Sequence, residues 1–340
     1  MGGAMMGKRK QRDQSKSVSA QSSKRQPLSP KQVQSELMEG VTVETLIALG
    51  VLTQKGGASP SARRKVKQVN HLLKQMSSAL SDIFNRYDDP IIVDMGAGRA
   101  TVSLALYDRW IRAHGKGQLI AIESRPELVQ KVKQATQDNY PRFHMIEGSA
   151  LKVELPKRVH LVLGLHACDL ATDYAIARGI THKADYFSLV PCCQAEFAQA
   201  LKQSQRKDAL SNLWSSAHHR REFGAHLTNV VRTQVLKSVG YAVTVTELTG
   251  WEHSMKNELI LGRRVGRYHE QSKTDLNHLL QEAGLLGTEG EHLEHSPWLI
   301  KELPKLIAQR DEVQPNQDTQ QQDAQQQDTQ QQSAKQVDNS

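Results

Sequence analysis

Five side chains that can act as nucleophiles, bases or metal ligands lie in two short stretches of the sequence. His166, Cys168 and Asp169 form one group, Cys192 and Cys193 form the other, and together they include all three cysteines of the chain. Each group directly follows an apolar run that is typical of a buried strand. Because the carboxyl ends of parallel strands meet at one edge of a sheet, we expect the two groups to lie side by side.

A third stretch has the composition of a ligand-binding turn. It reads Pro90-Ile-Ile-Val-Asp-Met-Gly-Ala-Gly-Arg-Ala-Thr101, which predicts a strand, a tight glycine turn and then a helix. Glycine lets a ligand lie against the backbone, and the N–H groups at the start of a helix favour an anionic ligand group. The residues expected to line a cofactor site here are Asp94, Gly96, Ala97, Gly98 and Ala100.

The next predicted strand narrows the choice of cofactor. Residues 118–124 end in Glu123 and Ser124, and an acid at this edge of a doubly wound sheet can accept hydrogen bonds from both hydroxyls of a ribose. NAD and S-adenosylmethionine both carry such a ribose. The dinucleotide fingerprint needs Gly or Ala where this chain has Thr101. The spacing from Asp94 to Ala100 instead resembles that of class I S-adenosylmethionine-dependent methyltransferases, so S-adenosylmethionine is the expected cofactor.

Strand-like and helix-like runs alternate from residue 90 to residue 265. This predicts an α/β fold built on a doubly wound, mostly parallel seven-stranded sheet, with N-terminal helices and a small C-terminal helical extension. A short connection before the last strand suits an antiparallel pair, so we expect one reversed strand at the edge of the sheet. A long helix is expected over 60–87, and strands are expected over 90–95, 118–123, 142–147, 159–165, 184–191, 241–248 and 257–264.

Three further motifs make the resemblance more specific. After the glycine turn come Gly164-Leu-His-Ala-Cys-Asp-Leu-Ala-Thr-Asp173, then Val190-Pro-Cys-Cys-Gln194, then Lys256-Asn257 before the last strand. In this order they resemble the class I methyltransferases that carry an LHACD…PCC…KN signature. A broader relative of this group methylates tRNA ribose. The resemblance covers about residues 60–265.

The resemblance implies a Rossmann-like class I methyltransferase and assigns roles to the residues found above. It places the glycine turn at the methionine and ribose parts of S-adenosylmethionine, Glu123 at the ribose hydroxyls, and Ser149 near the adenine. Class I enzymes often have Asp at the position of Ser149. The resemblance places these five residues at the methyl-transfer site: His166, Cys168, Asp169, Cys192 and Cys193.

The chemistry of that group stays open between three hypotheses. Cys192 follows a proline and resembles the Pro-Cys nucleophile of enzymes that form 5-methylcytosine. His166 and the three cysteines number four, as a zinc site requires, although adjacent cysteines seldom reach one tetrahedral ion. In the third hypothesis the thiols only line a pocket and no metal is bound. His166 or Asp169 could remove a proton if the acceptor must lose one.

Basic residues are concentrated in two parts of a chain whose formal net charge is +8 at pH 7. The N-terminal arm holds Lys8-Arg-Lys10-Gln-Arg12, and the insert over 201–240 holds Arg220 and Arg221. Such residues neutralise phosphates without reading sequence, so we expect RNA, as tRNA or rRNA, to bind the arm and the insert. The candidate substrate-binding residues are Lys256, Asn257, Arg220 and Arg221. A solvated arm and helix face are the simpler reading.

Composition divides the chain into five parts. We expect a disordered basic arm over 1–26, an N-terminal helical segment over 27–87, a methyltransferase domain over 88–266, a C-terminal helical extension over 267–312, and a disordered Gln-rich tail over 313–340. The sequence shows no secretory signal and no membrane-length apolar run, and its cysteines are few. A cytoplasmic location without membrane association is therefore expected.

Two other functions remain open at this stage. The chain could be an RNA-binding protein with a vestigial cofactor pocket, or a methyltransferase of a small-molecule or protein acceptor. Methyl transfer needs mainly that the acceptor be held about 3–3.5 Å from the methyl carbon, so the sequence does not name the acceptor.

Overall fold

A seven-stranded sheet forms the centre of the structure, a computed structural model that describes residues 40–53, 57, 60–137, 139–165, 167, 170–191, 195–248, 258–266 and 270–312. The strands are β1 (Ile91–Met95), β2 (Gln118–Glu123), β3 (Phe143–Glu147), β4 (Leu161–Leu165), β5 (Tyr186–Val190), β6 (Tyr241–Glu247) and β7 (Glu258–Arg264). All seven lie where the sequence predicts them, so the predicted α/β fold is confirmed.

The strand order is β3-β2-β1-β4-β5-β7-β6, and only β7 runs antiparallel to its neighbours. The prediction of a reversed strand at the edge was therefore wrong in its position. The reversed strand is β7, and it lies between β5 and β6. Burial explains this order, because Leu259 and Ile260 of β7 are fully buried whereas Val245 of β6 is 43% exposed. The more apolar strand of the hairpin takes the inner position.

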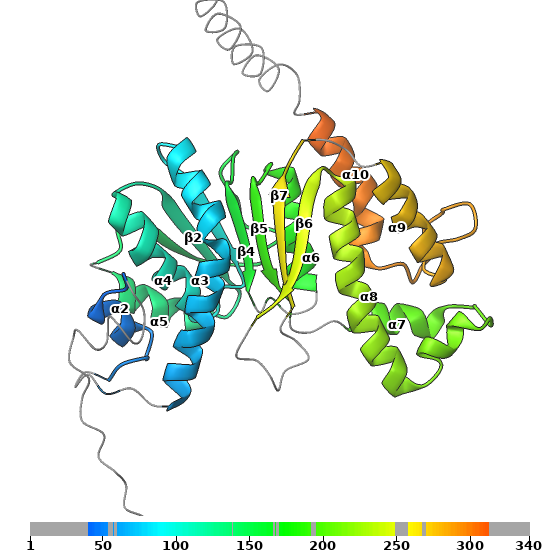
Figure 1. The fold of residues 1–340 in the computed structure, drawn as a ribbon, viewed down its shortest axis with the longest axis horizontal. Coiled ribbons are helices and arrows are strands. Elements are labelled where there is room, and N and C mark those ends of the chain that lie inside the picture. The colour runs from blue at the N-terminus through cyan, green and yellow to red at the C-terminus, as the bar shows by residue number, and fades with distance from the viewer. Residues whose placement is uncertain are drawn as a thin grey trace, which may run out of the picture.

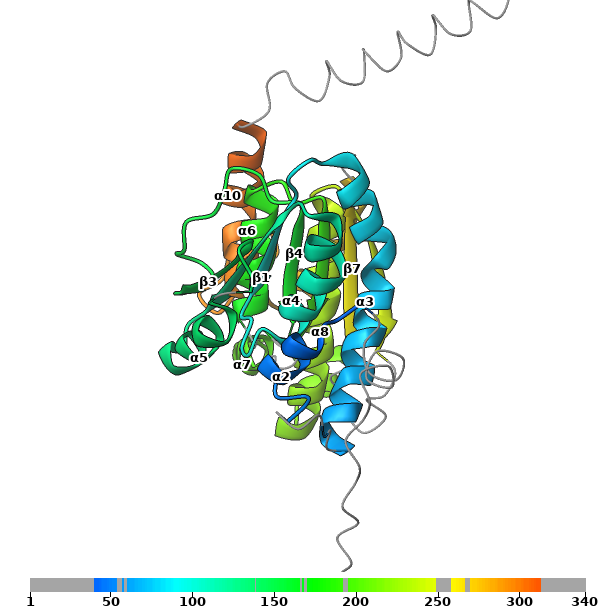
Figure 2. The same cartoon turned by 90° about the vertical axis from the view of Figure 1, so that its left-hand side faces the viewer.

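Helices cover both faces of the sheet (Figure 1). One face packs against α2 (Val43–Ala48), α3 (Pro60–Arg86), α4 (Thr101–Leu106) and α5 (Pro126–Thr136). On the other face α6 (Leu170–Thr181) and α8 (Ala217–Ser238) pack against the strands. Helices α7 (Glu196–Gln203) and α9 (Glu270–Glu282) pack against α8, and α10 (Trp298–Glu312) packs against α6. Figure 2 shows α3 on one side of the sheet and α6 with α10 on the other. None of the described helices has both the length and the apolar character that crossing a bilayer requires.

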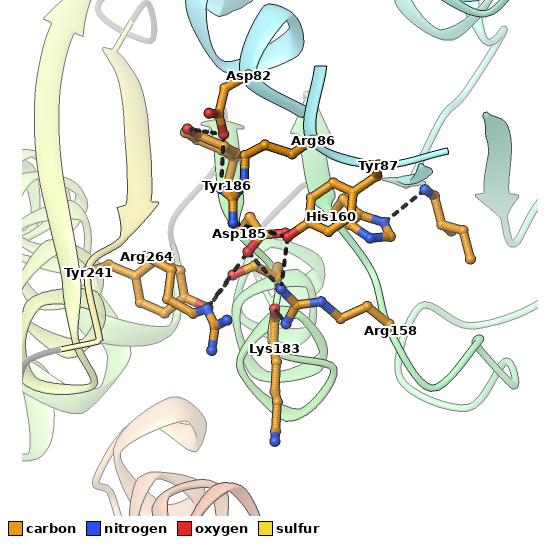
Figure 3. Close-up of polar contacts among 12 residues, drawn as sticks. Asp82, Arg86, Tyr87, Arg158, His160, Lys183, Asp185, Tyr186, Tyr241 and Arg264 are labelled. Atoms are coloured by element: carbon orange, nitrogen blue, oxygen red, sulfur yellow. Dashed lines mark hydrogen bonds and ion pairs between the residues drawn. The ribbon is translucent and has the colours of Figure 1, made fainter. Parts of the chain in front are cut away.

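The carboxyl end of α3 is fixed to the amino ends of β4 and β5 by a polar cluster (Figure 3). The Tyr186 hydroxyl donates to Asp82 at 2.9 Å, and burial together with that carboxylate raises the pKa of Tyr186 to about 12. The Tyr87 ring lies 4.1 Å from the ring of His160, centroid to centroid. The Nδ1 of His160 accepts from the Ile91 N–H at 2.9 Å, and burial lowers the pKa of His160. This cluster lies at the edge of the sheet opposite the glycine turn.

A buried ion pair joins α6 to α8. Arg232 and Asp173 are 0% and 2% exposed in their side chains, and the guanidinium Nε and Nη2 each donate to one carboxylate oxygen at 2.8 Å. The Nη1 of Arg232 also donates to the Oδ1 of Asn229 at 3.3 Å, and the Nδ2 of Asn229 donates to Glu258 at 2.5 Å. A continuous polar network therefore runs from α6 through α8 to the start of β7.

We predict that Arg232→Met lowers the free energy of unfolding by about 3–5 kcal/mol, because it removes the cation that forms an ion pair with the buried Asp173 carboxylate. Urea denaturation followed by circular dichroism measures the change. The double variant Arg232→Met, Asp173→Asn is the control and should recover most of the loss. A double variant as unstable as the single one would show that the ion pair is not the cause.

Candidate functional site

The glycine turn between β1 and α4 adopts a left-handed backbone. Gly96, Gly98 and Ala100 have φ of 80°, 58° and 53°, a region that L side chains rarely adopt. The N–H groups of Gly96 and Ala97 both donate to the carbonyl of Ile122 at 2.9 Å, which fixes the turn against the end of β2. The turn lies next to the point where the strand order reverses, between β1 and β4, and ligands of open α/β sheets bind at such points.

A cavity of about 230 Å³ opens over this turn. The turn and the start of α4 form one wall, the carboxyl ends of β4 and β5 form a second, and α3 forms a third. The lining residues are Gln68, Val69, Leu72, Asp94, Gly96, Ala97, Gly98, Arg99, Thr101, Val102, Arg125, Leu165, Val190 and Leu248. The structure therefore brings Asp94, Gly96, Ala97 and Gly98 together at one cavity, and their role as cofactor ligands stays a prediction.

Three of the predicted cofactor residues do not line this cavity, namely Ala100, Glu123 and Ser149. Ala100 is fully buried in the core, where its small side chain packs below the turn. Ser149 follows β3, and its hydroxyl accepts a hydrogen bond from the Leu151 N–H at 3.3 Å. Its proposed place near the adenine stays a prediction.

Asp94 carries a buried carboxylate with one unused oxygen. The side chain is 2% exposed, and its Oδ2 accepts a hydrogen bond from the Ser103 hydroxyl. Its Oδ1 is buried and has no hydrogen-bond partner among the described residues. Burial, with a smaller contribution from the charge of Glu123, raises the pKa of Asp94 from 3.8 to about 7 although the Ser103 hydrogen bond opposes the shift. A cationic ligand group at Oδ1 would satisfy both the charge and the open acceptor position.

Glu123 is a buried acid with the opposite shift. Its carboxylate accepts from the Gly98 N–H at 2.8 Å, from the Arg125 N–H at 3.0 Å, and from the Arg125 guanidinium at 3.0 and 3.2 Å. Burial alone would raise the pKa of Glu123, but the Arg125 hydrogen bonds and charge and the Gly98 N–H outweigh it and hold the pKa below its ordinary value. Glu123 is thus a charged group at neutral pH.

A second and larger cavity, of about 620 Å³, lies between α7, α8 and the end of β5. Its basic side chains are Lys202, Arg220, Arg221 and His226, and its acidic ones are Glu222 and Glu258. Both arginines predicted to bind substrate therefore lie in one cavity. Val190 lines the first cavity and the next residue, Pro191, lines the second, so both cavities reach the carboxyl end of β5.

Seven of the predicted site residues lie outside the described part of the chain: His166, Cys168, Asp169, Cys192, Cys193, Lys256 and Asn257. Their roles as base, nucleophile, zinc ligands or pocket lining stay predictions. The described residues next to them do lie at the site, since Leu165 and Val190 line the first cavity and Pro191 and Glu258 line the second.

Sequence reasoning missed several residues that form the site. The Ser103 hydroxyl donates a hydrogen bond to Asp94. The sequence places Ser103 in the first turn of the helix after the glycine turn, so this contact could have been expected. Arg125 follows the strand end by two residues and could have been expected near Glu123. The contact between Asn229 and Glu258 joins α8 to β7, and no local sequence pattern predicts a contact between residues so distant in the sequence.

The family model described as a methyltransferase domain matches residues 64–200. This stretch of the chain is therefore a methyltransferase domain, and it contains the glycine turn, Glu123 and the ends of β4 and β5. A search of curated proteins gives no match to the chain.

Solved structures with a similar arrangement include three methyltransferases. An rRNA methylase from Streptococcus thermophilus is 10% identical, with 56% of this chain and 94% of that chain covered and a TM-score of 0.37. A precorrin-6y C5,15-methyltransferase from Geobacter metallireducens is 17% identical, with 56% and 88% covered and a TM-score of 0.35. An SAH-bound methyltransferase from Podospora anserina is 13% identical, with 69% and 92% covered and a TM-score of 0.38.

The residues present fit S-adenosylmethionine, the cofactor that the sequence predicts for this domain. The open Oδ1 of Asp94 suits the ammonium of its methionine part. The left-handed glycine turn leaves room for the ligand to lie against the backbone. Glu123 is charged and lies beside the turn, where it can accept from ribose hydroxyls.

We predict that the affinity for S-adenosylhomocysteine falls as the pH falls below about 7. Ionised Asp94 attracts the ligand ammonium, and the pKa of Asp94 before binding is about 7, so binding should weaken by up to about tenfold per pH unit below that value. Calorimetric titrations at pH 5.5, 6.5 and 8 measure the dissociation constant. Asp94→Asn should bind more weakly at pH 8 and lose this pH dependence. An affinity that is equal from pH 5.5 to pH 8 would contradict the assignment.

The same shift has a consequence for stability. Because the folded pKa of Asp94 lies above its ordinary value of 3.8, ionisation of Asp94 opposes folding. The protonated Asp94 carboxyl contributes to stability fully below about pH 4, and this contribution is lost as the pH rises through about 7. In the absence of ligand, Asp94→Asn should therefore melt at a higher temperature than the wild type at pH 8, and the difference should disappear at acidic pH.

Proposed function

We propose that the protein is an S-adenosylmethionine-dependent methyltransferase that acts on RNA. One observation carries the proposal: a basic cavity that contains Arg220 and Arg221 reaches the carboxyl end of β5, the strand end that also lines the cofactor cavity. An acceptor that extends from the basic cavity past the end of β5 would reach the site where the cofactor supplies its electrophilic methyl group. RNA presents both phosphates for the arginines and nucleophilic groups for methylation.

The geometry of α8 supports an anionic acceptor. The hydroxyl of Ser216 accepts from the His219 N–H at 3.2 Å and so caps the helix, which places Arg220 and Arg221 in its first turns. The Arg220 guanidinium donates to the carbonyl of Trp214 at 3.2 Å. The Nη2 of Arg221 lies 3.1 Å from the Nδ1 of His218. These two contacts orient the arginines and involve no acid, whereas the Arg221 Nε also forms an ion pair with Glu222 at 3.3 Å.

The base of the basic cavity contains a fixed hydrogen-bonding pair. Asn229 and Glu258 both line the cavity, and the buried ion pair between Arg232 and Asp173 supports Asn229 from below. Such a pair can orient an acceptor molecule by hydrogen bonds to the N–H and O–H groups of that acceptor. In this proposal the chain's contribution is to hold the acceptor in line with the methyl group, which requires little covalent chemistry.

The proposal extends to the remaining parts of the chain. The basic arm over 1–26 would add phosphate contacts to those of the insert over 201–240, and both would act in the cytoplasm. The domain division into 1–26, 27–87, 88–266, 267–312 and 313–340 belongs to the same proposal.

We predict that the double variant Arg220→Ala, Arg221→Ala weakens binding to total tRNA and rRNA and reduces its salt dependence. If each arginine contacts one phosphate, the slope of log affinity against log salt should become shallower by roughly 1.4 to 1.8. Filter binding between 50 and 200 mM salt measures the slope, and transfer of labelled methyl groups from S-adenosylmethionine to the same RNA measures the reaction.

Lys131→Ala, Lys133→Ala is the matched control, because these lysines are exposed on α5 and do not line either cavity. It should leave the slope within about 0.3 of the wild type. A wild type that binds S-adenosylhomocysteine but shows no salt-dependent RNA binding would contradict RNA as the acceptor and favour a small molecule or a protein. RNA binding without methyl transfer to any acceptor would favour a binding protein.

A further inference from the structure

We propose that the Arg125 side chain competes with the ribose hydroxyls of the cofactor for the carboxylate of Glu123. Binding of the cofactor would then require the guanidinium to leave this carboxylate, so Arg125 sets both the affinity for the cofactor and the requirement for a ribose diol. The inference rests on the assignment of the first cavity to S-adenosylmethionine.

The protein's own donors use the hydrogen-bonding capacity of Glu123. A carboxylate has two oxygens and about four acceptor positions. In Glu123 the Oε1 accepts from the N–H and the Nε of Arg125, both at 3.0 Å, and at 3.5 Å from the Ser124 hydroxyl. The Oε2 accepts from the Gly98 N–H at 2.8 Å and from the Nη2 of Arg125 at 3.2 Å. Protein donors therefore fill all four positions, and a ribose diol can be accepted only if some of them leave.

The backbone donors are not the ones that can leave. The Gly98 N–H belongs to the turn that is fixed to β2. The Arg125 N–H is held because Arg125 is the N-cap residue of α5 and the next residue, Pro126, is the first of the helix. The two guanidinium contacts depend only on the rotamers of one side chain. That side chain is 59% exposed, whereas Glu123 is 4% exposed, so the arginine can move into solvent and the acid cannot.

The Arg125 guanidinium lies over the glycine turn. Its Nη2 lies 3.8 Å from the point where a Cβ on Gly98 would be, which is the space over the turn that the ligand needs. Arg125 lines the cofactor cavity, but Glu123 does not. The side chain therefore lies between the cavity and the acid that is expected to recognise the ribose.

The two arginine contacts have the geometry that a vicinal diol would need. The Nε and Nη2 form a planar fork that reaches both carboxylate oxygens, and two ribose hydroxyls could replace them one for one. A ligand without these hydroxyls could not replace the fork. The arginine of the pair is 59% exposed, and the ribose hydroxyls would take over its hydrogen bonds to the buried acid, so the competition would tune the affinity without preventing binding.

Calorimetric titration of S-adenosylhomocysteine into the full-length protein tests the proposal. Arg125→Ala should bind about two- to fivefold more tightly than the wild type, the range expected when a half-exposed ion pair no longer has to be broken. Arg125→Lys should lie between the two, because its single ammonium cannot form the fork. Arg99→Ala is the matched control, since Arg99 lines the same cavity but none of the described contacts to Glu123 involves it. It should not show this gain.

The 2′,3′-dideoxy analogue of S-adenosylhomocysteine gives a second readout. It leaves the Arg125 contact with Glu123 in place, so Arg125→Ala should not improve its binding. Weaker or equal binding of S-adenosylhomocysteine by Arg125→Ala would overturn the competition and show instead that Arg125 contacts the ligand or has no influence on it. A wild type that binds no S-adenosylhomocysteine at all would overturn the cofactor assignment itself, which is a separate result.

Discussion

The left-handed turn between β1 and α4 is the constraint on which the rest of the site depends. The strand must end, reverse its direction and start a helix within a few residues, and the φ values of Gly96, Gly98 and Ala100 meet that requirement. The two hydrogen bonds from Gly96 and Ala97 to Ile122 tie this turn to β2. Because β2 ends in Glu123, the same contacts set the distance between the backbone of the turn and the acid. The position of the cofactor cavity follows from this arrangement.

Two buried acids beside the turn differ in how the protein treats their charge. Burial raises the pKa of Asp94 to about 7, and the Oδ1 of its carboxylate has no hydrogen-bond partner among the described residues. Arg125 and backbone N–H groups keep Glu123 charged. One acid therefore gains from a cationic ligand, while the other already has a cation that a ligand must replace. This difference connects the affinity for the cofactor to both pH and the mobility of one arginine side chain.

Much of the fold and of the candidate site could be predicted from the sequence. The features that could not be predicted have a common physical cause. The strands, the long helix α3 and the turn follow from local patterns, namely apolar periodicity and glycine spacing, and they were confirmed. The place of β7 inside the sheet depends on which strand of a hairpin buries more surface, which is a property of the assembled sheet. The contacts of Arg125 with Glu123 and of Asn229 with Glu258 depend on rotamers and tertiary packing. The fold was therefore more predictable than the partners of its polar side chains.

The central claim is that the cavity over the glycine turn binds S-adenosylmethionine. A thermal-shift measurement with S-adenosylhomocysteine, and separately with NAD and NADH, tests it most directly. A ligand at 100 times its dissociation constant adds about 2.7 kcal/mol to the stability of the folded state. We predict a clear rise in the melting temperature with S-adenosylhomocysteine and none with either nicotinamide nucleotide. A rise with NAD or NADH and none with S-adenosylhomocysteine would contradict the account.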